Sequence, residues 1–110
     1  PVIEQFEPDW ILVSAGYDAH ADDPLAEMRL ASIDYHGFAS RLASLLAPNR
    51  IVTFLEGGYS LSAITASVAA TMRGYDGLVY DGVASTLTSP PSAWEALEEA
   101  KQVQREYWEL

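Results

Sequence analysis

Two continuous apolar runs, each ending in glycine, constrain the fold of this chain more than any other feature. The first is "WILVSAG", residues 10–16, and the second is "RIVTFLEGG", residues 50–58. Runs of this kind, bounded by turn-forming residues, are typical of strands buried on both faces of a parallel sheet. We therefore predict parallel strands at about 10–15 and 51–55.

An amphipathic segment separates the two runs. Its apolar residues recur at helical spacing on one face: Tyr35, Phe38, Leu42, Leu45 and Leu46. Ser32 suits the N-cap, Asp34 suits the positive first turn, and Pro48 ends the helix, which we predict over 32–47. A strand, a helix and a second strand make a right-handed crossover between parallel strands.

The rest of the chain extends this α/β pattern. We predict a helix over 61–74 with Gly74 near its end, a short third strand over 77–80, a connection over 81–91 and a last helix over 92–108. With 110 residues the chain is one partial domain. A parallel sheet needs helices on both faces and more strands than these, so the elements resemble a slice of a larger α/β domain.

Composition excludes several classes of function. Sixteen acidic against six basic residues give a net charge of -10, which opposes binding to nucleic acid or to an anionic membrane surface. There is no cysteine, so a metal would need Asp, Glu or His ligands. Neither a membrane-spanning run nor a signal-like start is visible, and we expect a cytoplasmic protein. An initial proline suits either a removed methionine or a chain that continues a longer one.

Polar residues follow both predicted strands. Because ligands bind beyond the carboxyl ends of parallel strands, these side chains are expected to converge: Asp18, His20, Asp22, Asp23, Glu56 and Tyr59. Asp18 and His20, two residues apart in extended backbone, could hold Zn²⁺, Fe²⁺ or Mn²⁺. The alternative is structural, with Asp18 and Asp23 capping turns and His20 in a loop.

Tyr59 has two readings of the same kind. It follows Gly57 and Gly58, whose conformational freedom would let the phenol be aimed into a cleft and donate to an oxyanion. The alternative is a tyrosine that caps the core. Spacing does not decide whether Glu56 is a partner of the site, and His36 is expected to be structural. A serine nucleophile is disfavoured because Ser14, Ser60 and Ser62 lack the Gly-x-Ser-x-Gly turn.

The two strand ends together carry a resemblance. "FEPDWILVSAGYDAHADDPLAEM", followed after about thirty residues by "RIVTFLEGGYSL", resembles the C-terminal part of the zinc-dependent histone deacetylase superfamily, with its acetylpolyamine amidohydrolases and acetoin-utilisation proteins. The resemblance covers about residues 1–80. It implies a segment of an arginase/deacetylase-like three-layer fold that hydrolyses an acetyl-amide of the acetyl-lysine or acetylpolyamine type.

The resemblance also implies residue roles. Asp18 matches a metal ligand for Zn²⁺, with Fe²⁺ as the alternative, and Tyr59 matches the tyrosine that stabilises the oxyanion. Leu25 matches a residue of the acyl-lysine channel, and Gly57 and Gly58 match the glycines that set the catalytic tyrosine. His20 matches no ligand.

Part of that pattern is absent from this chain. The superfamily also uses a His-His pair and an Asp-x-His earlier in the sequence, whereas none of the seventeen residues before Asp18 is histidine. We therefore expect a chain that is inactive alone and forms a homo-oligomer through exposed apolar surface. The alternative is a free-standing oligomeric remnant that serves as a binding module without catalysis. A flavodoxin-like ligand-binding domain is a third reading, and the lack of a Gly-rich phosphate loop opposes it.

Overall fold

The computed structural model describes residues 1–84 and 88–110. They fall into two compact units, Asp9–Ser85 and a smaller one of Pro1–Pro8 with Thr86–Leu110. Part of the predicted connection over 81–91 lies outside the described residues.

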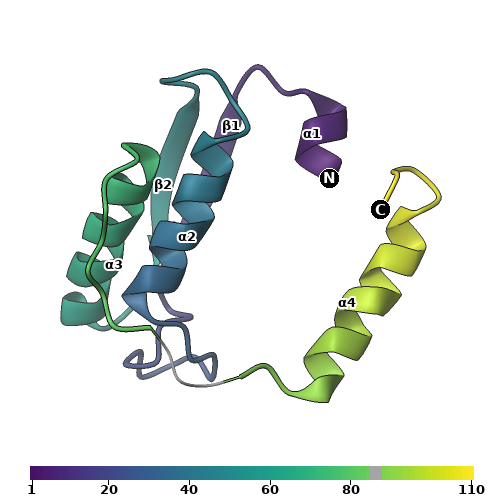
Figure 1. Cartoon of the computed structure of the whole chain (residues 1–110). Helices are drawn as coiled ribbons and strands as arrows, with labels where there is room; N and C mark the ends of the chain where they lie inside the picture. Colours follow the sequence, from purple (N-terminus) through teal and green to yellow (C-terminus); the bar gives the residue numbers. More distant parts are fainter. Residues whose placement is uncertain (85–87) are drawn as a thin grey trace. The chain divides into compact units, whose positions relative to one another are not determined.

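The larger unit contains the predicted crossover (Figure 1). Its elements are β1 (Ile11–Gly16), α2 (Ser32–Ala43), β2 (Ile51–Gly57) and α3 (Leu61–Tyr75). The strands pair in parallel, from Ile11 opposite Ile51 to Ala15 opposite Leu55, and an irregularity then places Gly16 opposite Gly57. Both predicted strands and the helix that joins them are confirmed.

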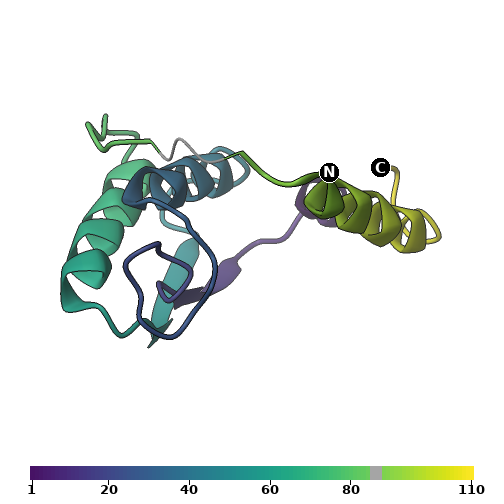
Figure 2. The same ribbon diagram turned by 90° about the horizontal axis from the view of Figure 1, so that it is seen from below.

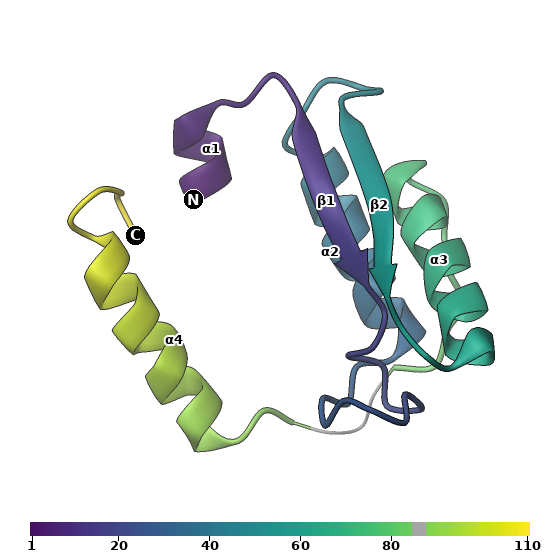
Figure 3. The ribbon, with the colours of Figure 1, turned by 180° about the vertical axis from the view of Figure 1, so that it is seen from behind.

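The two helices cover one face of the strand pair. In Figure 3, β1 and β2 lie in front of α2 and α3. Figure 2, seen from below, also shows both helices on one side of the strand pair. Tyr17 and Tyr35 contribute the large buried rings, with centroids 5.1 Å apart, and small residues of α2 and α3 complete the core: Ala39, Ala63, Ser67, Ala70 and Thr71. Small side chains let the two helices approach closely.

The opposite face of the strands is open. Leu12 is 68% exposed and Phe54 52%, whereas Ile11 and Val13 are half-buried on the helix side. The prediction of strands buried on both faces is therefore wrong for this unit, because none of its described residues covers the face that carries Leu12, Val52 and Phe54. Continuous apolar runs are typical of strands that are covered on both faces. In this unit, α2 and α3 cover only one face.

Helix α2 begins with a carboxylate contact. The N-cap is Ala31 and not Ser32, and the Asp34 carboxylate accepts the Ala31 N–H at 2.7 Å. The helix ends at Ala43, four residues before the predicted end, where the N–H of Ser44 donates to the Ser40 carbonyl and its hydroxyl donates to the Arg41 carbonyl.

Helix α3 ends in a glycine cap that replaces the predicted third strand. Gly77 has a φ of 66°, its N–H donates to the Gly74 carbonyl, and the Leu78 N–H donates to the Arg73 carbonyl at 2.8 Å. These two hydrogen bonds form the pattern of a Schellman cap. Because these groups complete the helix end, residues 77–80 form no strand.

The capped segment also contacts α2. The His36 ring nitrogen Nε2 lies 2.8 Å from the Leu78 carbonyl, and its ring stacks on Tyr80 with centroids 5.9 Å apart. His36 is thus structural, as expected.

The smaller unit contains α1 (Val2–Phe6) and α4 (Pro91–Gln104). Sequence reasoning missed the five-residue α1, and it extended the last helix to residue 108. The Gln5 side-chain amide donates to the Glu109 carbonyl at 2.7 Å and accepts the Glu109 N–H at 2.9 Å. Phe6 and Trp108 pack edge to face at 6.4 Å. None of the described helices is long and apolar enough to cross a membrane.

The contact between α2 and α3 depends on Gly74. A Cβ there would stand 2.6 Å from the His36 carbonyl oxygen and 2.8 Å from the Ala39 Cβ, so the Gly74→Ala chain must separate the helices. We expect a loss of about 1–3 kcal/mol in the free energy of unfolding, measured by urea denaturation. Gly37→Ala is the control, since a Cβ there meets no atom within 4 Å; it should raise stability by about 0.5–1 kcal/mol. Equal effects of the two substitutions would contradict this account of the packing.

Candidate functional site

The candidate site lies at the carboxyl ends of β1 and β2. Because the strands are parallel, the loop after β1 and the loop after β2 leave from the same end of the sheet, as Figure 2 shows from below. The Tyr17 N–H donates to the Gly57 carbonyl at 3.0 Å, which joins the two loops at their origin. The predicted site residues that follow the two strands therefore share one end of the sheet.

Two glycines make room for the Asp18 carboxylate. A Cβ on Gly16 would stand 2.8 Å from Asp18 Oδ1, and a Cβ on Gly57 would stand 3.6 Å from Asp18 Cγ. Asp18 thus lies against the last residue of both strands. The structure brings this predicted metal ligand next to the Gly-Gly-Tyr segment.

Gly58 has a different reason to be glycine. Its φ of 120° is one that side chains rarely adopt, and a Cβ would stand 2.9 Å from Ile64. Gly58 therefore carries the chain from β2 toward α3 through a conformation that other residues resist. Tyr59 follows it with its side chain 63% exposed. The alternative in which Tyr59 caps the core is therefore wrong.

Asp23 connects the two loops. Its Oδ1 accepts the Leu25 N–H at 2.9 Å and its Oδ2 accepts the Tyr59 N–H at 2.7 Å. Burial by itself raises the pKa of this carboxyl. Hydrogen bonds from backbone N–H groups lower the pKa by a larger amount, so the net shift is downward. These N–H groups belong to Leu25, Tyr59, Ala26 and Ser60. The bond to Leu25 makes Asp23 a turn cap, one of the roles that the sequence indicates for this residue, whereas the bond to Tyr59 has no signal in local spacing.

His20 is held by structural contacts on both ring nitrogens. Nδ1 lies 3.1 Å from the Asp22 backbone nitrogen, which can only donate, so Nδ1 accepts and the ring proton is on Nε2. Nε2 lies 3.3 Å from Ser32 Oγ, which in turn lies 3.1 Å from Ser67 Oγ. His20 therefore ties its loop to α2 and α3.

The same contacts resemble a Ser-His-Asp triad without its chemistry. Asp22 Oδ2 lies 3.9 Å from His20 Nδ1, on the side away from Ser32. With the proton already on Nε2, the imidazole cannot accept one from the Ser32 hydroxyl, which a triad requires.

The residues that the structure describes do not by themselves assemble a complete metal centre. Across residues 1–84 and 88–110, no three His, Asp or Glu side chains come together in a way that could hold an ion. Catalytic zinc sites normally have three protein ligands. Asp18 is a single carboxylate at this end of the sheet, and Glu56 lies at the exposed end of β2.

Comparison with known proteins decides the family. The histone deacetylase domain matches residues 1–75. The chain belongs to the histone deacetylase family. It is 44% identical over 93 residues to "Histone deacetylase 14, chloroplastic" of Arabidopsis thaliana, which is 82% of this chain and 22% of that protein. It is 32% identical over 108 residues to "Polyamine deacetylase HDAC10" of Danio rerio, which is 98% of this chain and 16% of that protein.

Solved deacetylase structures share the fold. The histone deacetylase Clr3 matches with a TM-score of 0.88 and 31% identity, over 98% of this chain and 18% of that one. The HD domain of HDA15 matches with a TM-score of 0.84 and 28% identity, over 98% of this chain and 28% of that one. The predicted fold class, a segment of the deacetylase α/β domain, is confirmed. This chain spans less than a third of the length of any of these four proteins.

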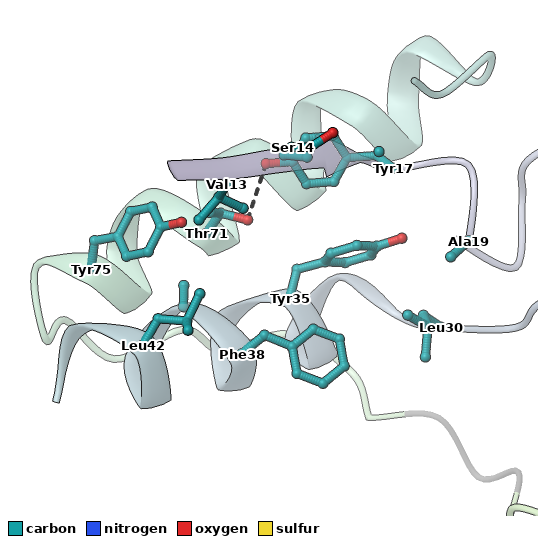
Figure 4. Close-up of a pocket in the computed structure, with 13 residues that line it drawn as sticks. Val13, Ser14, Tyr17, Ala19, Leu30, Tyr35, Phe38, Leu42, Thr71 and Tyr75 are labelled. Atoms are coloured by element: carbon teal, nitrogen blue, oxygen red, sulfur yellow. Dashed lines mark hydrogen bonds between the residues drawn. The ribbon is translucent and has the colours of Figure 1, made fainter. Parts of the chain in front are cut away.

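A cavity of about 260 Å³ lies behind the site of this deacetylase segment (Figure 4). It is lined by β1, α2 and α3, and in it the Tyr17 hydroxyl donates to Thr71 Oγ1 at 3.2 Å. The Tyr35 hydroxyl is buried and has no hydrogen-bond partner among the described residues. Burial, and then the negative charge of Asp18, raise the pKa of Tyr35 to about 12.

This pKa predicts a loss of stability in alkali. The folded-state pKa lies above the ordinary value of 10.0, so the stability that Tyr35 contributes is complete below pH 10 and is lost as the pH rises toward 12. In Tyr35→Phe we expect a smaller decline over that range, and unchanged or higher stability at pH 7 because an unpartnered buried hydroxyl is removed. Urea denaturation at several pH values measures both. Tyr59→Phe, at an exposed ring, is the control, and an equal alkaline decline in wild type and Tyr35→Phe would contradict the assignment.

Proposed function

We propose that this chain is the segment of a metal-dependent deacetylase that carries one metal ligand and the oxyanion-stabilising tyrosine. The observation that supports the proposal is the approach of Asp18 to Gly57, which puts the carboxylate beside the segment that ends in Tyr59. The family match and the deacetylase names of the relatives support the reaction class. The substrate class is an acetyl-amide of the acetyl-lysine or acetylpolyamine type.

The chemistry divides between this chain and the rest of the domain. Asp18 supplies one ligand to a Zn²⁺ or Fe²⁺ ion whose other ligands, with the proton-transferring histidines, come from outside these 110 residues. The exposed Tyr59 phenol donates a hydrogen bond to the oxygen of the acetyl group as negative charge develops there. Leu25, Gly57 and Gly58 contribute to the channel that admits the acyl chain. The chain alone is inactive.

The open face of the strands supports the need for a partner. Leu12, Val52 and Phe54 form an exposed apolar surface on strands that a deacetylase domain three or more times longer would cover. We propose that the remaining part of such a domain covers this surface, whether it is joined to the chain or separate.

A second candidate function rests on the same surface. Alone, the chain buries its open face against a second copy and acts as an oligomeric binding module without catalysis.

A cytoplasmic location remains part of the proposal, although two of the relatives are named as chloroplastic.

The enzymatic proposal is tested in a chimera. In Arabidopsis thaliana histone deacetylase 14, the region that matches this chain is replaced by this chain, and hydrolysis of acetyl-lysine peptides and acetylpolyamines is measured together with bound zinc. We expect activity, a loss of about 10²–10³-fold in kcat with unchanged zinc content in Tyr59→Phe, and loss of zinc in Asp18→Asn. Tyr107→Phe, at another exposed tyrosine, is the control. Full activity in Tyr59→Phe, or full zinc content in Asp18→Asn, would overturn the role of that residue.

The oligomer is tested on the chain alone. Phe54→Glu places a charge on the open face and is expected to convert a self-associating chain into a monomer in sedimentation velocity at micromolar concentration. Leu61→Glu substitutes an apolar residue at the start of α3 that is even more exposed than Phe54, and it should leave the association unchanged. A wild-type chain that is already monomeric at these concentrations would refute this second candidate.

A further inference from the structure

The Asp23 carboxylate accepts hydrogen bonds from the backbone of two predicted site residues. The bonds from Asp23 go to the backbone N–H groups of Leu25 and Tyr59, the predicted channel residue and the predicted catalytic residue. Leu25 is two residues away in the chain and Tyr59 is 36 residues away. Asp23 itself is 7% exposed, although both side chains that it serves are exposed.

A simple turn cap does not account for this arrangement. An aspartate before proline caps its own loop with one oxygen, as Oδ1 does at Leu25. The other oxygen of Asp23 makes the shorter bond, and that bond leaves the loop to reach the segment after β2. A carboxylate this buried needs hydrogen bonds to stay charged, and the cross-loop bond is one of those that satisfy it.

The segment that contains Tyr59 has little conformational restriction of its own. Gly58, with its φ of 120°, immediately precedes Tyr59, and Ser60 begins the cap of α3. Glycine permits many conformations at this point, so the direction in which the Tyr59 side chain leaves the backbone needs another constraint. The bond from the Tyr59 N–H to Asp23 supplies it, between a flexible glycine and a capped helix.

We propose that Asp23 is the positioning residue of the site, which fixes the Tyr59 phenol and the Leu25 side chain relative to each other through their backbone N–H groups. The inference rests on the roles proposed above for Tyr59 and Leu25. Asp23 touches neither substrate nor metal in this account. Its effect passes through Tyr59.

Other titratable groups lie around Asp23. Glu27 and Arg29, on its own loop, line the same surface hollow, and the Tyr35 phenol of α2 senses the Asp23 charge. From the segment after β2, backbone N–H groups of Tyr59 and Ser60 face the carboxylate. The amide protons therefore report the charge of Asp23 directly.

The test follows these amides by nuclear magnetic resonance on the whole 110-residue chain. In wild type we expect the Tyr59 and Leu25 amide protons to shift together with pH, with one midpoint below the ordinary 3.8 of an aspartate. At neutral pH the Tyr59 amide should exchange slowly with solvent. A Leu25 amide that titrates while Tyr59 does not, or a Tyr59 amide that exchanges as fast as an exposed one, would show a turn cap only and overturn the proposal.

Two neighbouring aspartates give a matched pair of variants. Asp23→Asn should abolish the titration of the Tyr59 amide and speed its exchange, whereas Asp22→Asn, at a side chain 74% exposed, should change neither. If Asp23→Asn does not fold, the wild-type titration and exchange decide the question without it. None of these readouts uses metal or substrate, so they can fail or succeed independently of the deacetylase proposal.

The positioning role has its own kinetic signature in the chimera. Asp23→Asn should lower kcat without loss of zinc, and the same substitution in a Tyr59→Phe background should cause no further loss of kcat, because the two act through one side chain. Independent, multiplicative losses in the double variant would show that Asp23 serves the fold and not Tyr59.

Discussion

The parallel pairing of β1 with β2 is the constraint on which the rest of the larger unit depends. Parallel strands cannot be joined by a tight turn, so the chain must return through a crossover, and α2 is that crossover. The same pairing sends both following loops out of one end of the sheet. Only then can Asp18 lie against Gly57, 39 positions later in the printed sequence, and only then can Asp23 reach the backbone of Tyr59.

The pairing also creates a surface that the unit does not cover. Helices α2 and α3 lie on one face of the strands (Figure 3). The other face carries the exposed residues Leu12, Val52 and Phe54. Parallel sheets are ordinarily covered on both faces because their strands are apolar on both. The strands that build the candidate site are thus the same strands that carry the uncovered face, in a chain that spans less than a third of the length of these relatives.

Polar side chains connect the loops of the site to each other and to the helices. Asp23 accepts backbone N–H groups from two loops, and His20 connects its loop to Ser32 of α2 and, through it, to Ser67 of α3. Buried donors and acceptors are costly to leave unpaired, so these hydrogen bonds constrain the geometry of the loop. Both residues follow Asp18 within five positions, which explains how one short loop can contain a candidate ligand and its supports.

The sequence by itself determined the elements that local pattern encodes: two apolar strands, the crossover helix, the helix after β2, and the end of the sheet where polar residues gather. It also carried the paired motifs that mark Asp18 and Tyr59. Tertiary structure decided what depends on distant partners. Gly74 is required by His36 and Ala39 of another helix, while Gly77 makes the cap that removes the expected strand at 77–80. The second oxygen of Asp23 bonds to Tyr59, far along the chain. Such contacts join residues that no period of two or 3.6 relates, so only the folded backbone brings them together.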